Sequence, residues 1–161
     1  MRDILEKAIS IAVKRHAGQV DKAGEPYILH PLRVMMKMTT DHERAIAVLH
    51  DIIEDGTVPG PVLMNGGIPK ELVFIIELLS RGRNQTYDHY IKHLSTSFTA
   101  VRVKLADLED NANVLRLVKF TSKDAARTQK YLKTYQFLKE QYCKLMPYEG
   151  YEKLIGNKKY V

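Results

Sequence analysis

One six-residue segment concentrates the groups that are able to do chemistry. It reads His50-Asp51-Ile52-Ile53-Glu54-Asp55, an imidazole and three carboxylates within about two turns of an expected helix. With His30 upstream and Asp107 downstream, the chain offers two imidazoles and two carboxylates. This borderline-hard set suits Mn²⁺, Fe²⁺ or Zn²⁺ and leaves positions for water and substrate. Because carboxylates remain for proton transfer, we expect a metal-dependent hydrolase.

The helix that carries this segment is expected from about Asp41, as its N-cap, to Glu54. Its apolar arc consists of Ala45, Val48, Leu49, Ile52 and Ile53. His50, Asp51 and Glu54 fall on the opposite arc, with Asp55 at its edge. The solvent-facing side of an amphipathic helix shows the same pattern, so periodicity alone leaves both interpretations open.

The helix that begins near Thr99 carries acids in an apolar setting. A complete core stripe is predicted from Val101, Leu105, Leu108, Ala112 and Leu115. A second stripe, formed by Val103, Asp107, Asp110 and Val114, would also be apolar without its two acids. A carboxylate there is costly to bury unless it binds a cation or a hydrogen-bond donor. Asp107 and Asn111, four residues apart, share a direction and are able to serve one site, although a structural hydrogen bond or exposure would also fit.

Apolar residues recur at helical spacing almost throughout, so the fold class predicted is all-α. Further helices are expected from about residue 4 to near 18, after His30-Pro31, and over 69–79, 86–96, 99–117 and 122–146, with a loop between 56 and 69. We expect one helical domain over residues 1–149 and a C-terminal tail over 150–161.

Composition and charge narrow the function classes. The chain has 161 residues, one cysteine and a formal net charge of +6. A disulfide framework within the chain is excluded, and a cytoplasmic protein with no membrane segment is expected. The positive charge fits a polyphosphorylated small molecule. Nucleic acid is not expected, because the basic residues form no aromatic-interleaved stripe. A homo-oligomer is compatible with the sequence.

The ordered set His30, His50-Asp51 and Asp107 resembles the signature of the HD superfamily of metal-dependent phosphohydrolases. Longer segments resemble the hydrolase domain of the RelA/SpoT family: His16-Ala17-Gly18-Gln19, Gly24-Glu25-Pro26-Tyr27-Ile28-Leu29-His30-Pro31, the hexapeptide, and Lys104-Leu105-Ala106-Asp107 with Asn111. The match covers residues 3 to 117, and the chain length is that of the stand-alone small alarmone hydrolases.

This resemblance implies hydrolysis of the 3′-pyrophosphate of (p)ppGpp, a stringent-response alarmone, with release of pyrophosphate and GDP or GTP. It implies Mn²⁺ bound by His30, His50, Asp51 and Asp107. Glu54 and Asp55 would orient or deprotonate the attacking water, and Asn111 would contact the substrate.

The chain departs from the family pattern where the base pocket is expected. Guanosine-specific members tend to carry an Arg-Lys pair there, and this chain has Asp21-Lys22. An aspartate repels phosphates but accepts hydrogen bonds from a base edge. Adenine alarmones therefore stay open as substrates beside guanine ones. Two alternatives remain: an HD-type phosphohydrolase acting on another nucleotide such as a dNTP, and a non-enzymatic binder of nucleic acid or a regulatory nucleotide.

Overall fold

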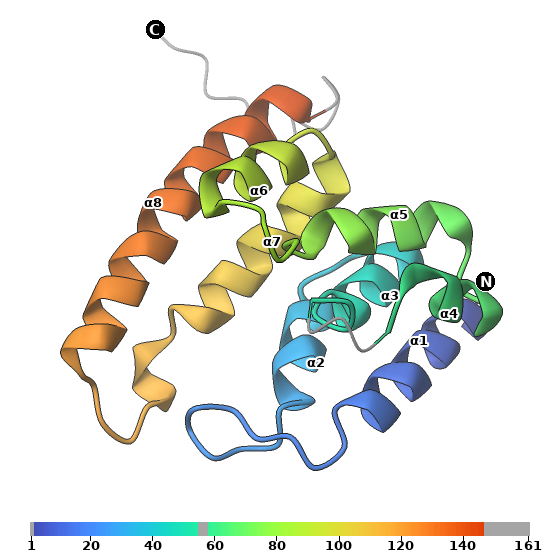
Figure 1. Ribbon diagram of the computed structural model, residues 1–161, viewed down its shortest axis with the longest axis horizontal. Helices are drawn as coiled ribbons and strands as arrows, with labels where there is room; N and C mark the ends of the chain where they lie inside the picture. The colour runs from blue at the N-terminus through green and yellow to red at the C-terminus, as the bar shows by residue number, and fades with distance from the viewer. Residues whose placement is uncertain (1, 55–57, 147–161) are drawn as a thin grey trace, which may run out of the picture.

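The chain folds as an all-helical single domain (Figure 1). The computed structural model describes residues 2–54 and 58–146, so Asp55 and the predicted tail over 150–161 lie outside the described residues. The helices are α1 (Arg2–Arg15), α2 (Leu29–Met36), α3 (Asp41–Leu49), α4 (Gly60–Asn65), α5 (Lys70–Leu79), α6 (Tyr87–Leu94), α7 (Phe98–Asn111) and α8 (Ser122–Leu145), with a short 3₁₀ helix η1 (Val114–Arg116). In these ranges the backbone forms one isolated β-bridge, between Val20 and Pro26, and no strand. The predicted all-α class is confirmed.

Helix α3 lies at the centre, where α1, α2, α5 and α7 pack against it. Its residues from Ala45 to Leu49 are all buried, including those on the arc opposite the predicted apolar stripe. Ala45 and Ala47 are fully buried, as are Ala8 and Ala12 of α1. Such small side chains let neighbouring helices approach closely. The second half of α3, which leads into the chemical segment, is therefore enclosed by protein on all sides, whereas His42 in its first turn is exposed.

Both ends of α3 differ from the prediction. The N-cap is Thr40 and not Asp41, because the Thr40 side chain accepts from the Glu43 backbone N–H while Glu43 reaches back to the Thr40 N–H. The helix ends at Leu49, with His50 as its C-cap, instead of continuing to Glu54. Beyond this point backbone bonds join Ile52 to Leu49 and Glu54 to Asp51, three residues apart. The chain therefore forms tight turns over the segment that carries the polar residues.

Two further predictions were wrong. The loop predicted over 56–69 contains α4, where Pro61 suits the first helical turn and Leu63 is buried in the core. The helix predicted over 99–117 ends at Asn111, and Leu115, predicted to lie in the core, is 93% exposed. The turn at Ala112 redirects the chain into η1, so helical periodicity no longer applies there. The starts of α5 and α8 agree with the prediction to within one residue.

The packing of α7 brings the chemistry together. This helix contacts α2 and α3 on one side, and α8 runs along another side (Figure 1). Residues from α2, from the end of α3 and from α7 can therefore meet at one point. None of the described helices is long and apolar enough to cross a membrane.

Candidate metal centre and substrate pocket

Three predicted ligands converge in the protein interior. His30 on α2, His50 after α3 and Asp107 on α7 each offer a ligand atom, and these atoms lie within 4.8 Å of one another. All three residues are buried. Asp51 joins them, since its Oδ1 lies 3.1 Å from His50 Nε2 and its Oδ2 lies 3.5 Å from His30 Nε2. The structure thus brings together all four residues predicted to bind a metal.

The environment of His50 fits a cation. Its Nδ1 lies 2.7 Å from the backbone oxygen of Ala47, which only accepts hydrogen bonds, so Nδ1 carries a proton. The buried Nε2 has no hydrogen-bond partner, although carboxylate oxygens of Asp51 and Asp107 lie 3.1 Å and 3.5 Å away. Orphaned polar atoms are rare in protein interiors. A divalent metal among this nitrogen and these carboxylates would satisfy all of them, so the residues fit the implied ion.

His30 lies among three carboxylates. Its Nε2 is 3.2 Å from Asp107 Oδ1, and its Nδ1 is 2.7 Å from Asp110 Oδ2. Burial by itself lowers the pKa of His30, but hydrogen bonds to Asp107, Asp110 and Asp51 outweigh it and raise the pKa to about 11. Burial would raise the pKa of Asp51, yet His50 and His30 hold it well below its usual range. The cluster therefore attracts positive charge, which a proton or a metal ion can supply.

Two side chains flank Asp107 on α7. The Lys104 ammonium lies 2.8 Å from Asp107 Oδ2 and 5.5 Å from the centre of the Tyr90 ring. The Asn111 amide donates to Asp107 Oδ1 at 2.5 Å, so the two residues do share one direction. Burial lowers the pKa of Lys104, but Asp107 and Tyr90 raise it well above its ordinary value, so the ammonium stays charged. Sequence reasoning assigned Lys104 no role, although it lies three residues before Asp107 on the same helix face.

A cavity of about 570 Å³ opens on the other side of Asp51, and Glu54, Tyr27 and His16 are among its lining residues. The Tyr27 hydroxyl donates to Asp51 Oδ2 at 2.5 Å, which fixes the orientation of this carboxylate. Glu54 forms part of the cavity wall. Desolvation of its carboxyl raises the pKa of Glu54; Lys104 opposes this effect and Asp51 adds to it. A carboxylate with a raised pKa is a better proton acceptor near neutral pH.

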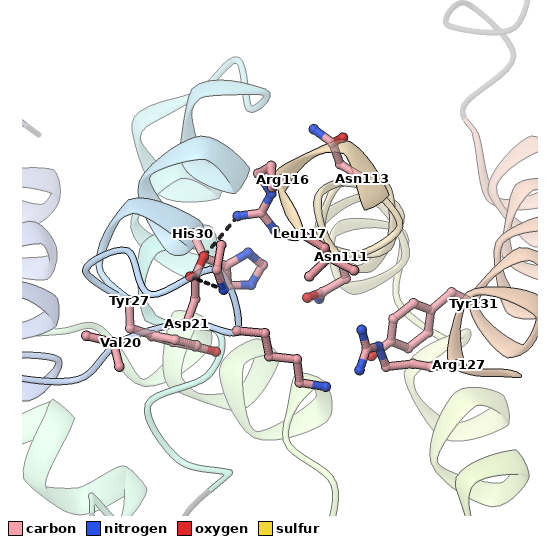
Figure 2. A pocket seen from close by; sticks show the side chains of 12 residues that line it. Val20, Asp21, Tyr27, His30, Asn111, Asn113, Arg116, Leu117, Arg127 and Tyr131 are labelled. Atoms are coloured by element: carbon pink, nitrogen blue, oxygen red, sulfur yellow. Dashed lines mark hydrogen bonds and ion pairs between the residues drawn. The ribbon is translucent and has the colours of Figure 1, made fainter. Parts of the chain in front are cut away.

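A second cavity, of about 400 Å³, lies beside His30 (Figure 2). Its lining includes three residues predicted to bind substrate, namely Asp21, Lys22 and Asn111. It also includes three that sequence reasoning missed, Arg116 of η1 and Arg127 and Tyr131 of α8. Figure 2 shows Arg127 and Tyr131 across the cavity from Asp21 and Tyr27. These residues belong to elements that only the tertiary fold brings to the site, and the local sequence gave no signal for them.

The carboxylate of Asp21 is already engaged by the protein. Its Oδ1 accepts from the backbone N–H groups of Ala23 and Glu25, at 2.8 and 3.1 Å. Its Oδ2 lies 3.1 Å from Arg116 Nη1. Asp21 therefore shapes its own loop and neutralises part of the charge of Arg116. Both carboxylate oxygens of Asp21 thus have partners within the protein, and its role toward a substrate stays a prediction.

No family model matches the chain, but comparisons with individual proteins find relatives. A bifunctional (p)ppGpp synthase/hydrolase, SpoT of Escherichia coli K12, is 30% identical over 125 residues, which are 69% of this chain and 18% of that protein. A guanosine-3′,5′-bis(diphosphate) 3′-pyrophosphohydrolase of Aquifex aeolicus is 46% identical over 55 residues, 32% of this chain and 8% of that protein. The chain thus spans less than a fifth of the length of these relatives.

A solved structure matches over most of the fold. It is described as a metazoan ortholog of SpoT that hydrolyzes ppGpp, and the superposition has a TM-score of 0.70 at 17% sequence identity. It covers 92% of this chain and 96% of the other. The chain therefore has the all-helical fold of a solved HD-type hydrolase structure, and this fold holds a buried His-His-Asp cluster. By sequence, the chain is related to the hydrolase domain of the RelA/SpoT family.

Proposed function

We propose that this chain hydrolyses the 3′-pyrophosphate of guanosine or adenosine tetra- and pentaphosphate alarmones. The products are pyrophosphate and a nucleoside di- or triphosphate. The observation that carries this proposal is the unpartnered, buried Nε2 of His50 among carboxylates, beside a cavity lined by cationic side chains. The activities named for the relatives point to the same substrate class.

His30, His50, Asp51 and Asp107 would hold the metal, with Mn²⁺ as the expected ion and Fe²⁺ or Zn²⁺ as suitable substitutes. Such an ion lowers the pKa of water and neutralises charge on phosphoryl oxygens. Other side chains of the protein orient these ligands. Tyr27 and Asn111 fix the carboxylates of Asp51 and Asp107 by donating hydrogen bonds to them. These bonds preserve the ligand geometry that the reaction needs.

Glu54 would accept the proton of the attacking water, because it lines the same cavity as Asp51 and its pKa is raised. Asp55 is the second acid proposed for this task. As the water oxygen bonds to phosphorus, the bond to the 3′ oxygen breaks, and the resulting 3′ hydroxyl takes up a proton. The cavity beside His30 would hold the rest of the nucleotide, where Lys22, Arg116 and Arg127 supply positive charge for the 5′ phosphates. The face of Tyr131 is available for stacking on a base.

The test is a turnover assay with ppGpp and ppApp, on protein stripped with a chelator and on the same protein reloaded with Mn²⁺. Pyrophosphate release, followed by ion chromatography, is expected only from the reloaded sample. A panel of dNTPs in the same assay tests the alternative HD-type nucleotide phosphohydrolase. If neither alarmone is hydrolysed while a dNTP is, the substrate assignment is wrong and the assignment of the site survives.

A further inference from the structure

Asp110 on α7 is a buried carboxylate that the proposed reaction does not use. Its side chain is 7% exposed. Its Oδ1 accepts from Arg33 Nε at 2.7 Å, and its Oδ2 accepts from Arg33 Nη2 at 3.0 Å. The same Oδ2 lies 2.7 Å from His30 Nδ1 and 3.3 Å from Arg116 Nη2. One carboxylate therefore connects the ring of His30 with two guanidinium groups from α2 and η1.

This arrangement determines both the charge of Asp110 and which ring nitrogen of His30 donates to it. A bidentate guanidinium contact holds a carboxylate in one orientation. Arg33 donates to both oxygens of Asp110, which is how a guanidinium binds an ionised carboxylate. An ionised carboxylate can only accept a hydrogen bond, so His30 Nδ1 must be the donor. The other ring nitrogen, Nε2, is then directed at Asp107 Oδ1, 3.2 Å away, and at Asp51 Oδ2, 3.5 Å away.

We propose that Asp110, held by Arg33, is a positioning residue that keeps the proton of His30 on Nδ1 and presents Nε2 to the metal. This inference rests on the metal site of the proposed function. Without Asp110 the ring can rotate or exchange its proton between nitrogens, and fewer molecules are ready to bind the ion. Losing such an outer partner typically reduces metal affinity by about 10- to 100-fold.

The test compares Asp110→Asn with Glu109→Gln, the same carboxylate-to-amide change one residue earlier on α7. Glu109 is a fair control, because its carboxylate bonds to Lys37 and Tyr135 at the surface and does not contact His30. Calorimetric titration of the chelator-stripped proteins with Mn²⁺ should show a roughly 10- to 100-fold weaker Kd for Asp110→Asn. The Kd of Glu109→Gln should stay within about twofold of the parent.

A readout specific to His30 separates positioning from a general loss of structure. In protein loaded with diamagnetic Zn²⁺, the Nδ1–H proton of His30 should give a protected NMR signal that is absent from His30→Ala. Asp110→Asn should weaken or remove this signal. In a double-mutant cycle, Asp110→Asn should cost little further Mn²⁺ affinity when His30 is already alanine. Additive losses would show that Asp110 acts independently of His30 and would overturn the inference.

Arg33→Gln is the second variant if Asp110→Asn does not fold, because Arg33 is partly exposed and, among the described residues, its side chain bonds to Asp110 alone. It should weaken Mn²⁺ binding in the same direction by a smaller factor. An unchanged Mn²⁺ affinity in a folded Asp110→Asn or Arg33→Gln protein would overturn this inference and leave the metal site of the proposed function intact. Absence of Mn²⁺ binding by the parent would instead overturn the metal site of the proposed function, and this inference with it.

Discussion

Two lysines form ion pairs of nearly equal length in different surroundings. Lys104 Nζ lies 2.8 Å from Asp107 Oδ2, and these side chains are 13% and 4% exposed. Lys37 Nζ lies 2.7 Å from Glu109 Oε2, and these side chains are 41% and 44% exposed. Water and salt screen the exposed pair but hardly reach the buried one. Replacing each lysine by methionine, which keeps most of the apolar stem, therefore isolates the effect of burial.

Removing one partner of a buried pair costs about 3–5 kcal/mol, because the remaining charge is left uncompensated. An exposed pair contributes about 0–1 kcal/mol. For a chain of this size, 1 kcal/mol shifts Tm by about 2–4 °C. We therefore expect Lys104→Met to lower the Tm of the chelator-stripped protein by roughly 6–20 °C, and Lys37→Met by no more than about 4 °C. Thermal unfolding followed by circular dichroism measures both.

Adding Mn²⁺ sharpens this prediction. At 100 times its Kd, a ligand contributes about 2.7 kcal/mol to the stability of the folded state. In Lys104→Met the ion would also replace the positive charge missing beside Asp107. Mn²⁺ should therefore raise the Tm of Lys104→Met by more than that of the parent. The reasoning is refuted if Lys104→Met loses no more stability than Lys37→Met, or if Mn²⁺ raises both Tm values equally.

Three other predictions concern the proton acceptor Glu54, the pocket loop that contains Asp21, and the capping residue Glu43 of α3. Glu54→Gln should leave the Mn²⁺ Kd unchanged and lower kcat by about 10²- to 10⁴-fold; turnover at the parent rate would mean that another group takes the proton. Asp21→Asn keeps an oxygen for the loop N–H groups but releases Arg116, so the alarmone KM should fall by roughly two- to fivefold; a higher KM would instead support base recognition by Asp21. Burial would raise the pKa of Glu43, but hydrogen bonds with Thr40 and the charge of Arg102 outweigh burial and lower the pKa. The ionised Glu43 therefore stabilises the folded state at pH values above its ordinary pKa of 4.5, and this contribution is lost as the pH falls through the lowered pKa. Glu43→Gln should therefore lower Tm more at pH 7 than at pH 3, and an equal loss at both would contradict the shift.

The sequence determined the helices because periodicity, proline and capping residues act locally. The start of α5 after Pro69 and the start of α8 after Thr121 follow from such signals. Local signals failed where packing overrides them. Helix α4 forms within a segment rich in glycine and proline because Leu63 fills the core, and Leu115 is exposed because the chain turns after α7.

The sequence also determined which residue types were available for chemistry. Imidazoles and carboxylates carry their ligand character wherever they lie, and the spacing of Asp107 among valines marked it as costly to bury. The resemblance to the RelA/SpoT hydrolase domain, stated from short motifs, is confirmed by relatives and by the fold. The individual roles of the site residues stay predictions that the variants above test.

Only the tertiary structure decided how these groups are held. The buried, orphaned Nε2 of His50 depends on the enclosure of α3 by four helices, which no local pattern encodes. Asp110 contacts His30 from 80 positions away, and Asp21 contacts Arg116 from 95 positions away. Such contacts arise when helices pack, and their geometry depends on the whole core. The sequence supplies the candidate ligands, and the packing of the helices determines their protonation, their hydrogen-bond partners and their orientation.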